Sequence, residues 1–229
     1  MTEKTKQLLI LLAMFVGVVV LWDTMLIYPI KLFVVMLHEI SHGLMAELVG
    51  GDIVSIEIDP RIGGVCRSSR PPGFFPTFMI ASAGYLGSLF WGAFIFLVAV
   101  HTDYDRVLSA LIGVGSLIIT YFVFKSGGLF GIIFCSLFSI FMLGSAKYLP
   151  QTFHDYFLKF IGLTSCLYVV IDINSDLISR SGIGSDADKI AEMTGVPSIL
   201  IGIAWMLIAL IIVILMLRNS IRKSASTSI

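Results

Sequence analysis

The stretch MLHEISHGLMAELVGG, residues 36–51, decides the interpretation of this chain. It places two histidines and a glutamate, His38, Glu39 and His42, inside a run of apolar residues. Residues four apart lie on one face of a helix, about 5–6 Å from each other, so both imidazoles can reach a single metal ion. Glu39 can take a proton from a water at that ion and deliver it to a leaving amine. The HExxH spacing therefore predicts a zinc site with a carboxylate base.

The chain around this motif has the composition of an integral membrane protein. Of its 229 residues, 57% are hydrophobic and 13% are charged, and the mean hydropathy is +0.98. Soluble domains carry about 25% charged residues, so a large soluble core fits poorly. The net charge is +0 and no basic block stands out, so no nucleic-acid partner is expected. Three cysteines cannot all pair, and Cys135 and Cys166 lie in apolar segments, so no disulfide framework is expected.

Apolar runs long enough to cross a bilayer recur along the chain. Because a spanning helix needs about 20 mostly apolar residues, we expect an all-α polytopic membrane protein with about 6–7 transmembrane helices. The candidate segments are 8–28, 31–50, 75–100, 107–124, 128–148, 157–179 and 197–217. The first follows two lysines like a secretory signal, but it lacks a convincing cleavage site, and we expect an uncleaved span. Residues 1–217 are expected to form one transmembrane domain and residues 218–229 a frayed polar tail.

The segment 51–70 departs from the helical pattern. Apolar and polar residues alternate from Val54 to Ile58, which is the period of a half-buried strand. Pro60 and two glycines then supply turn residues before a second short strand. We predict a small β-hairpin over residues 54–68, at the membrane surface just after the histidine helix, with an irregular loop as the alternative.

Two histidines leave a catalytic zinc site one protein ligand short. His42 lies about 12 Å inside Gly50 at the end of its span, at about 1.5 Å per residue. Asp172 lies about 12 Å inside Arg180, which marks the same-side end of the sixth span. The two residues are thus level, and a carboxylate in an apolar run needs a reason to be there. Asp172 is therefore the expected third ligand.

Asp186 is the alternative metal ligand. The segment GIGSDADKIAEMTGVP, residues 182–197, has the signals of a short surface helix, with Ser185 as N-cap and Gly195 just past its end. A place in the first turn of this helix gives Asp186 a structural role, so it ranks below Asp172. It becomes the ligand if the segment folds back into the membrane.

The third span carries small residues four apart. Ala83 with Gly87 and Gly84 with Ser88 form such pairs. Faces of this kind allow two helices to approach closely. We expect them to pack the third span against the histidine helix.

With these motifs in place, the chain resembles the site-2 protease family of intramembrane zinc metalloproteases. The resemblance rests on HEISH at 38–42, on the hairpin-like segment after it, and on ASAGYLG at 81–87. The last is similar to the family's Ala-Gly-Pro signature, with Tyr85 at the proline position. SDADKIAEMTGVP at 185–197 is similar to the ending of a compact bacterial, membrane-bound peptidase-like branch. The family's Asn-Pro-Asp-Gly segment is absent, and VVIDINSD at 169–176 stands in its place.

The resemblance implies a zinc endopeptidase that cuts in or near a transmembrane segment of a membrane-protein substrate. Glu39 would be catalytic, and His38, His42 and Asp172 would hold one Zn²⁺ ion. The implied partners are a transmembrane protein or peptide substrate and the lipid bilayer, and the implied location is a bacterial cytoplasmic membrane. The alternative is a non-enzymatic metal-binding membrane protein, such as a pseudoprotease, chaperone or carrier. An aspartyl protease built on Asp172 and Asp186 is disfavoured, because GIGSD is off by one from the Gly-x-Gly-Asp pattern.

Overall fold

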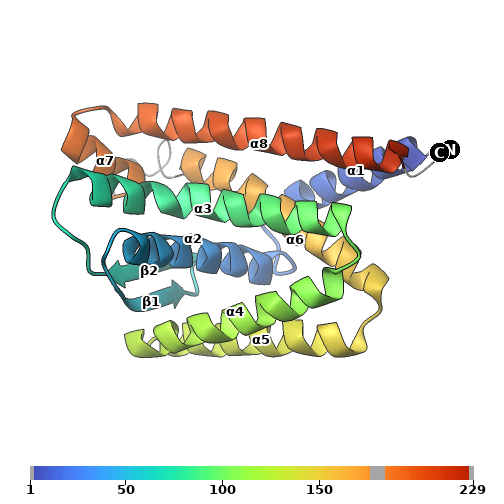
Figure 1. The fold of residues 1–229 in the computed structure, drawn as a ribbon, viewed down its shortest axis with the longest axis horizontal. Coiled ribbons are helices and arrows are strands. Elements are labelled where there is room, and N and C mark those ends of the chain that lie inside the picture. Colours follow the sequence, from blue (N-terminus) through green and yellow to red (C-terminus); the bar gives the residue numbers. More distant parts are fainter. Residues whose placement is uncertain (1–2, 176–183, 227–229) are drawn as a thin grey trace.

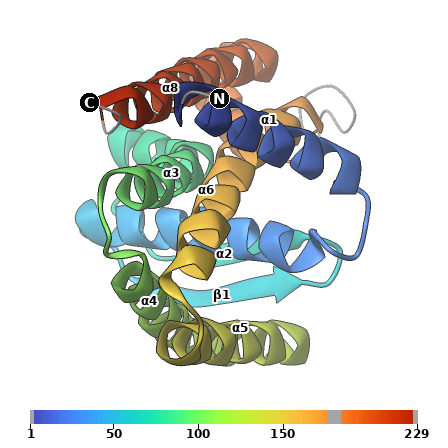
Figure 2. The same cartoon turned by 90° about the vertical axis from the view of Figure 1, so that its right-hand side faces the viewer.

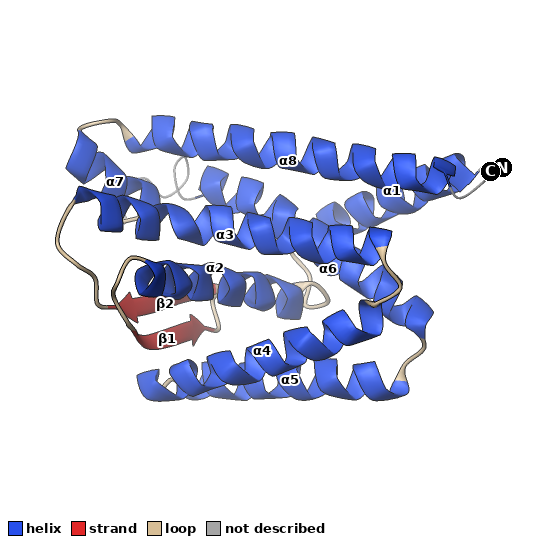
Figure 3. Ribbon diagram, in the orientation of Figure 1, coloured by secondary structure: helices blue, strands red, loops and turns tan. Residues whose placement is uncertain are grey.

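The computed structural model describes residues 3–175 and 184–226, which form eight helices and one two-stranded sheet (Figures 1 and 3). In chain order the elements are α1 (Glu3–Leu21), α2 (Tyr28–Leu48), β1 (Ile53–Asp59), β2 (Gly63–Ser68), α3 (Phe74–His101), α4 (Asp105–Ser126), α5 (Leu129–Tyr148), α6 (Gln151–Asn174), α7 (Asp186–Thr194) and α8 (Ser198–Ser226). Both termini lie at one end of the long axis, and α7 lies at the other end (Figure 1). A side-chain hydrogen bond from Gln7 to Ser220, at 2.9 Å, joins α1 to α8 near the termini.

Five helices of the described part are long and apolar enough to cross a membrane, namely α3, α4, α5, α6 and α8. This number is near the predicted six to seven, and the all-helical membrane class with a small hairpin is confirmed. Each of the seven predicted segments overlaps a helix. The apolar part of α1, Thr5–Leu21, is shorter than a full span, and α2 is not among the five.

Helix α2 lies in the interior of the protein. Nearly all of its residues from Ile30 to Gly43 are buried. Pro29 stands in its first turn, where a residue without an N–H costs no hydrogen bond. Figure 2 shows α2 between α3 and β1, with α6 crossing it. The polar residues of α2 therefore face protein and not lipid, as ionisable residues within membrane proteins usually do.

The predicted hairpin is present, with β1 and β2 paired antiparallel from Ile53 opposite Ser68 to Asp59 opposite Gly63. Its register shifts between Ile53 and Ser55, and an irregularity of this kind changes which side chains face inward. Ile53 is buried and Val54 is 53% exposed, so the predicted inward position of Val54 is wrong. The apolar side of β1 belongs to the same core cluster as the buried residues of α2.

The last two predicted spans end at residues 179 and 217. Helix α6 is described to Asn174 and its cap Ser175, so the expected end at 179 and Arg180 lie outside the described residues. Helix α8 continues past residue 217 to Ser226, so residues 218–226 of the expected polar tail are helical. The short helix predicted over 185–195 is confirmed as α7.

Candidate metal centre

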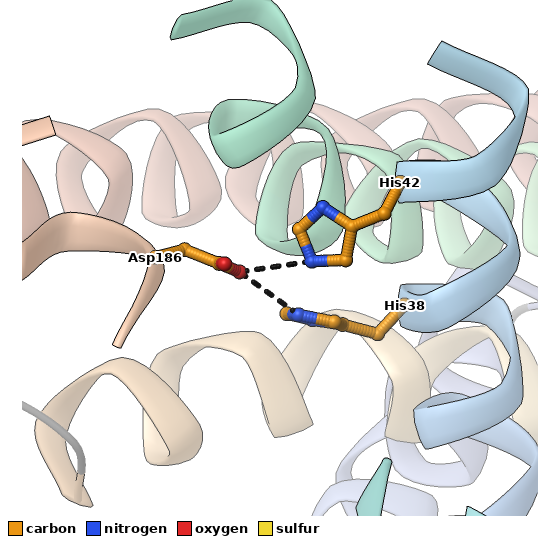
Figure 4. Close-up of side chains that lie close together, drawn as sticks. All are labelled: His38, His42 and Asp186. Atoms are coloured by element: carbon orange, nitrogen blue, oxygen red, sulfur yellow. Dashed lines mark hydrogen bonds and ion pairs between the residues drawn. The ribbon is translucent and has the colours of Figure 1, made fainter. Parts of the chain in front are cut away.

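Three side chains with metal-binding atoms meet at the end of the protein that carries α7 (Figure 4). The Oδ2 atom of Asp186 lies 3.1 Å from Nε2 of His38 and 3.0 Å from Nε2 of His42. The ligand atoms of the three residues all lie within 4.8 Å of one another. In residues 3–175 and 184–226, this is the group of histidine, cysteine and acidic residues that could hold a metal ion.

The His42 ring is oriented by a backbone contact from the third span. Its Nδ1 lies 2.7 Å from the carbonyl oxygen of Ile80, which can only accept a hydrogen bond. Nδ1 therefore donates to this carbonyl, and Nε2, which faces Asp186, is the nitrogen that would bind a metal ion. The His38 ring contacts the edge of Tyr85, with the ring centroids 4.9 Å apart. Helix α3 thus orients both rings.

A glycine on α3 allows this close approach. A Cβ atom at Gly84 would overlap Nε2 of both His38 and His42, and one at Gly87 would overlap the side chain of Ser41. Only a residue without a side chain fits at these two positions. The predicted packing of the third span against the histidine helix is therefore confirmed.

Glu39 lies beside the metal-binding group and outside it. Its side chain is buried, and it lines the same cavity as the two histidines. A Cβ atom at Gly64 of β2 would lie 2.6 Å from Cγ and 2.8 Å from Oε1 of Glu39. Strand β2 therefore packs against Glu39 at a glycine, and the missing side chain leaves room for the carboxylate.

The structure brings Asp186, the alternative ligand, against the two histidines. Asp186 contacts both imidazoles, whereas Asp172 lines the same cavity but lies outside the group of three. Asp186 is available to the histidines because Asp188, and not Asp186, caps α7. The Ser185 hydroxyl accepts from the Asp188 N–H at 3.2 Å, and the Asp188 carboxylate accepts from the Ser185 N–H at 3.0 Å. Capping therefore leaves the carboxylate of Asp186 available to the histidines.

The surroundings of Asp186 favour the ionised form of its carboxyl. Burial by itself raises the pKa of the carboxyl, but the imidazoles of His42 and His38 hold the pKa of Asp186 well below its usual range. Its second oxygen, Oδ1, lies 2.9 Å from the ammonium of Lys189. A carboxylate in this form is the species that binds metal ions. Sequence reasoning missed Lys189, although its i,i+3 spacing from Asp186 on a predicted helix indicates such a pair.

The group opens into a cavity of about 820 Å³, which is within the range of small-molecule and peptide sites. One wall carries the HExxH residues of α2, and another carries Asp186 and Lys189 of α7. All six residues of β2, 63–68, also line it. An extended segment lying along β2 would therefore pass the three metal-binding side chains.

A buried HExxH helix and an aspartate from a second helix, within a bundle of membrane-length helices, define an integral multi-pass membrane protein of the metallopeptidase type. The model of the family described as Peptidase M50B-like matches residues 11–216, and the chain belongs to this family, which is of the site-2 protease type. The match includes HExxH and Asp186. No curated protein and no solved structure matches this chain.

Proposed function

We propose that this protein is an intramembrane zinc endopeptidase of a bacterial cytoplasmic membrane, acting on a peptide bond in or near a transmembrane segment of its substrate. The observation that carries the proposal is the convergence of His38, His42 and Asp186 beside Glu39 in one cavity. Membership of the Peptidase M50B-like family supports it.

The donor set fits zinc. Two imidazole nitrogens and one carboxylate oxygen leave a fourth position open, as in catalytic zinc sites. Ligand bonds of about 2.0–2.2 Å in a tetrahedron place the ligand atoms about 3.3–3.5 Å apart. The two contacts from Asp186 to the imidazoles, at 3.1 and 3.0 Å, are close to that spacing. The ligand atoms of all three residues lie within 4.8 Å of one another, so modest adjustments of the side chains would bring them to one ion.

Each of the four residues has a defined task in this proposal. His38, His42 and Asp186 would hold the zinc ion, which when bound polarises a scissile carbonyl and brings the pKa of a bound water to about 7. Glu39 accepts the proton of the attacking water and delivers it to the leaving amine. The burial of Glu39 beside the metal-binding group supports this role.

The hairpin is the proposed holder of the substrate. A peptide bond inside a helix is shielded by the helix, so the substrate must be extended where it is cut. A strand edge binds extended peptides through main-chain hydrogen bonds. Strand β2 lines the cavity over residues 63–68 and packs against Glu39 at Gly64, so a peptide paired with β2 would cross the metal centre.

Metal analysis of the purified full chain tests the proposal. Wild-type protein is expected to carry about one zinc ion per chain, and the His38→Ala/His42→Ala variant to carry almost none. Both proteins are then reconstituted in vesicles with a panel of single-span test proteins. A wild type that binds zinc but cleaves none of them, under conditions in which a known intramembrane protease is active, would favour a non-enzymatic metal-binding protein.

A further inference from the structure

The two oxygens of the Asp186 carboxylate have different partners. Oδ2 faces His38 and His42, at 3.1 and 3.0 Å. Oδ1 faces the ammonium of Lys189, at 2.9 Å. Lys189 lies three residues further along α7, one helical turn away. Rotation of the carboxylate would separate Oδ1 from the ammonium, so the lysine and the histidines together set the plane of the group.

We propose that Lys189 is a positioning residue that holds Asp186 for metal binding through one oxygen only. This inference rests on the proposed zinc function of the same site. A carboxylate that gave both oxygens to the ion would occupy a second coordination position. The ammonium on Oδ1 opposes this, and it keeps a position open for water and substrate.

The contact differs from an ordinary pair on a helix surface. A pair between two exposed side chains at i,i+3 contributes little to stability. Here the Asp186 side chain is 7% exposed, whereas the Lys189 side chain is 57% exposed and lines the cavity. Lys189 also interacts electrostatically with Glu39, across from α7 on α2. The lysine thus reaches the buried ligand from the solvent side of the cavity.

Groups that orient metal ligands have a measurable effect on the metal. Removal of such a partner commonly costs about 10–100-fold in metal affinity. Lysine fits the task as a compact point charge that contacts a single oxygen. Arginine at the same position retains the charge and can still contact Oδ1. A neutral side chain of similar length removes the contact while preserving much of the apolar volume.

The test compares Lys189→Met with Lys189→Arg in the purified full chain, using zinc and Co²⁺ as probes. Lys147→Met is the matched control, because Lys147 is an exposed lysine in the last turn of α5. Zinc affinity is measured by competition with a chelating dye. We expect Lys189→Met to lower the affinity by about 10–100-fold, Lys189→Arg to recover most of the loss, and Lys147→Met to match wild type.

The visible absorption of bound Co²⁺ reports coordination number, since four-coordinate Co²⁺ absorbs more strongly than five- or six-coordinate Co²⁺. We expect weaker bands in Lys189→Met and wild-type bands in the arginine variant. Unchanged affinity and unchanged bands in Lys189→Met would overturn the role of Lys189. Failure of the wild-type protein to bind either metal would instead overturn the proposed zinc function.

Discussion

Gly64 of the hairpin lies against the carboxylate of Glu39, with room for a hydrogen and none for a methyl group. The two residues come from different elements, β2 and α2, and are 25 positions apart in the sequence, 64 − 39. The hairpin therefore helps to define where the proposed base lies, besides lining the cavity. Its position against α2 would couple the proposed binding of substrate to the proposed proton transfer by Glu39.

Replacement of Gly64 by alanine should displace Glu39. The new Cβ would lie 2.8 Å from Oε1, so the carboxylate must move. Because misplacement of a reacting group by about 1 Å can cost about 10²-fold in rate, cleavage should fall by roughly 10- to 10²-fold while zinc content stays at the wild-type level. Gly144→Ala of α5 is the control, since a Cβ there meets nothing within 4 Å. Equal cleavage by the two variants would refute the link.

Glu39→Gln should bind zinc and lose proteolysis. The amide keeps the shape of the side chain but cannot accept the proton of water, and the three proposed ligands are unchanged. Cleavage of a test substrate should fall by at least about 10²-fold. Zinc content is measured on the same preparation. Loss of zinc from Glu39→Gln would indicate that Glu39 is a ligand. Full activity of Glu39→Gln would show that Glu39 is not the base.

The two aspartates should differ in their effect on the metal. Asp186→Ala removes the carboxylate that contacts both imidazoles and should strip most of the zinc, because two imidazoles and water hold the ion poorly. Asp172→Ala should retain the zinc, since Asp172 lies outside that group. Metal content after dialysis against a weak chelator separates the two variants. If Asp172→Ala loses the zinc and Asp186→Ala keeps it, Asp172 is the third ligand, as the sequence analysis expected.

Gly84→Ala should damage the metal centre from the side of α3. The added methyl would overlap both imidazoles, and overpacking of this kind typically costs about 1–3 kcal/mol. We expect lower zinc affinity together with a lower unfolding temperature. Gly115→Ala of α4 serves as the control, because a Cβ there meets nothing within 4 Å. If Gly84→Ala binds zinc as well as the control does, the close packing of α3 on α2 is unimportant for the site.

Local signals in the sequence predicted much of this protein. The i,i+4 histidines, the alternation of the hairpin and the cap of α7 each depend on residues within one turn or one strand. The structure confirms the hairpin and the α7 cap in nearly the predicted bounds. The inward face of β1 was wrong at Val54, because a register shift between strands leaves no clear mark in one strand's own pattern.

The third side chain of the metal group could not be predicted in this way. His38 and Asp186 are 148 residues apart, and their contact depends on how the chain returns after α6. The depth estimate favoured Asp172 because Asp172 and His42 lie equally far from the ends of their predicted helices. Such an estimate compares positions along the membrane normal only. It carries no information on which side chains turn toward each other. The capping signal also assigned Asp186 a structural role in the first turn of α7. In the structure Asp188 makes the capping contacts with Ser185, so Asp186 is available to the histidines.

The distance along the chain between His38 and Asp186 also has a consequence for biosynthesis. The ribosome makes the HExxH helix early and α7 late, because the aspartate lies 148 positions after the first histidine. A nascent chain that already holds both histidines in the membrane still lacks the carboxylate that meets them. The proposed protease would therefore lack its complete set of metal ligands, and so its activity, until α7 has been translated and has brought Asp186 to the two histidines.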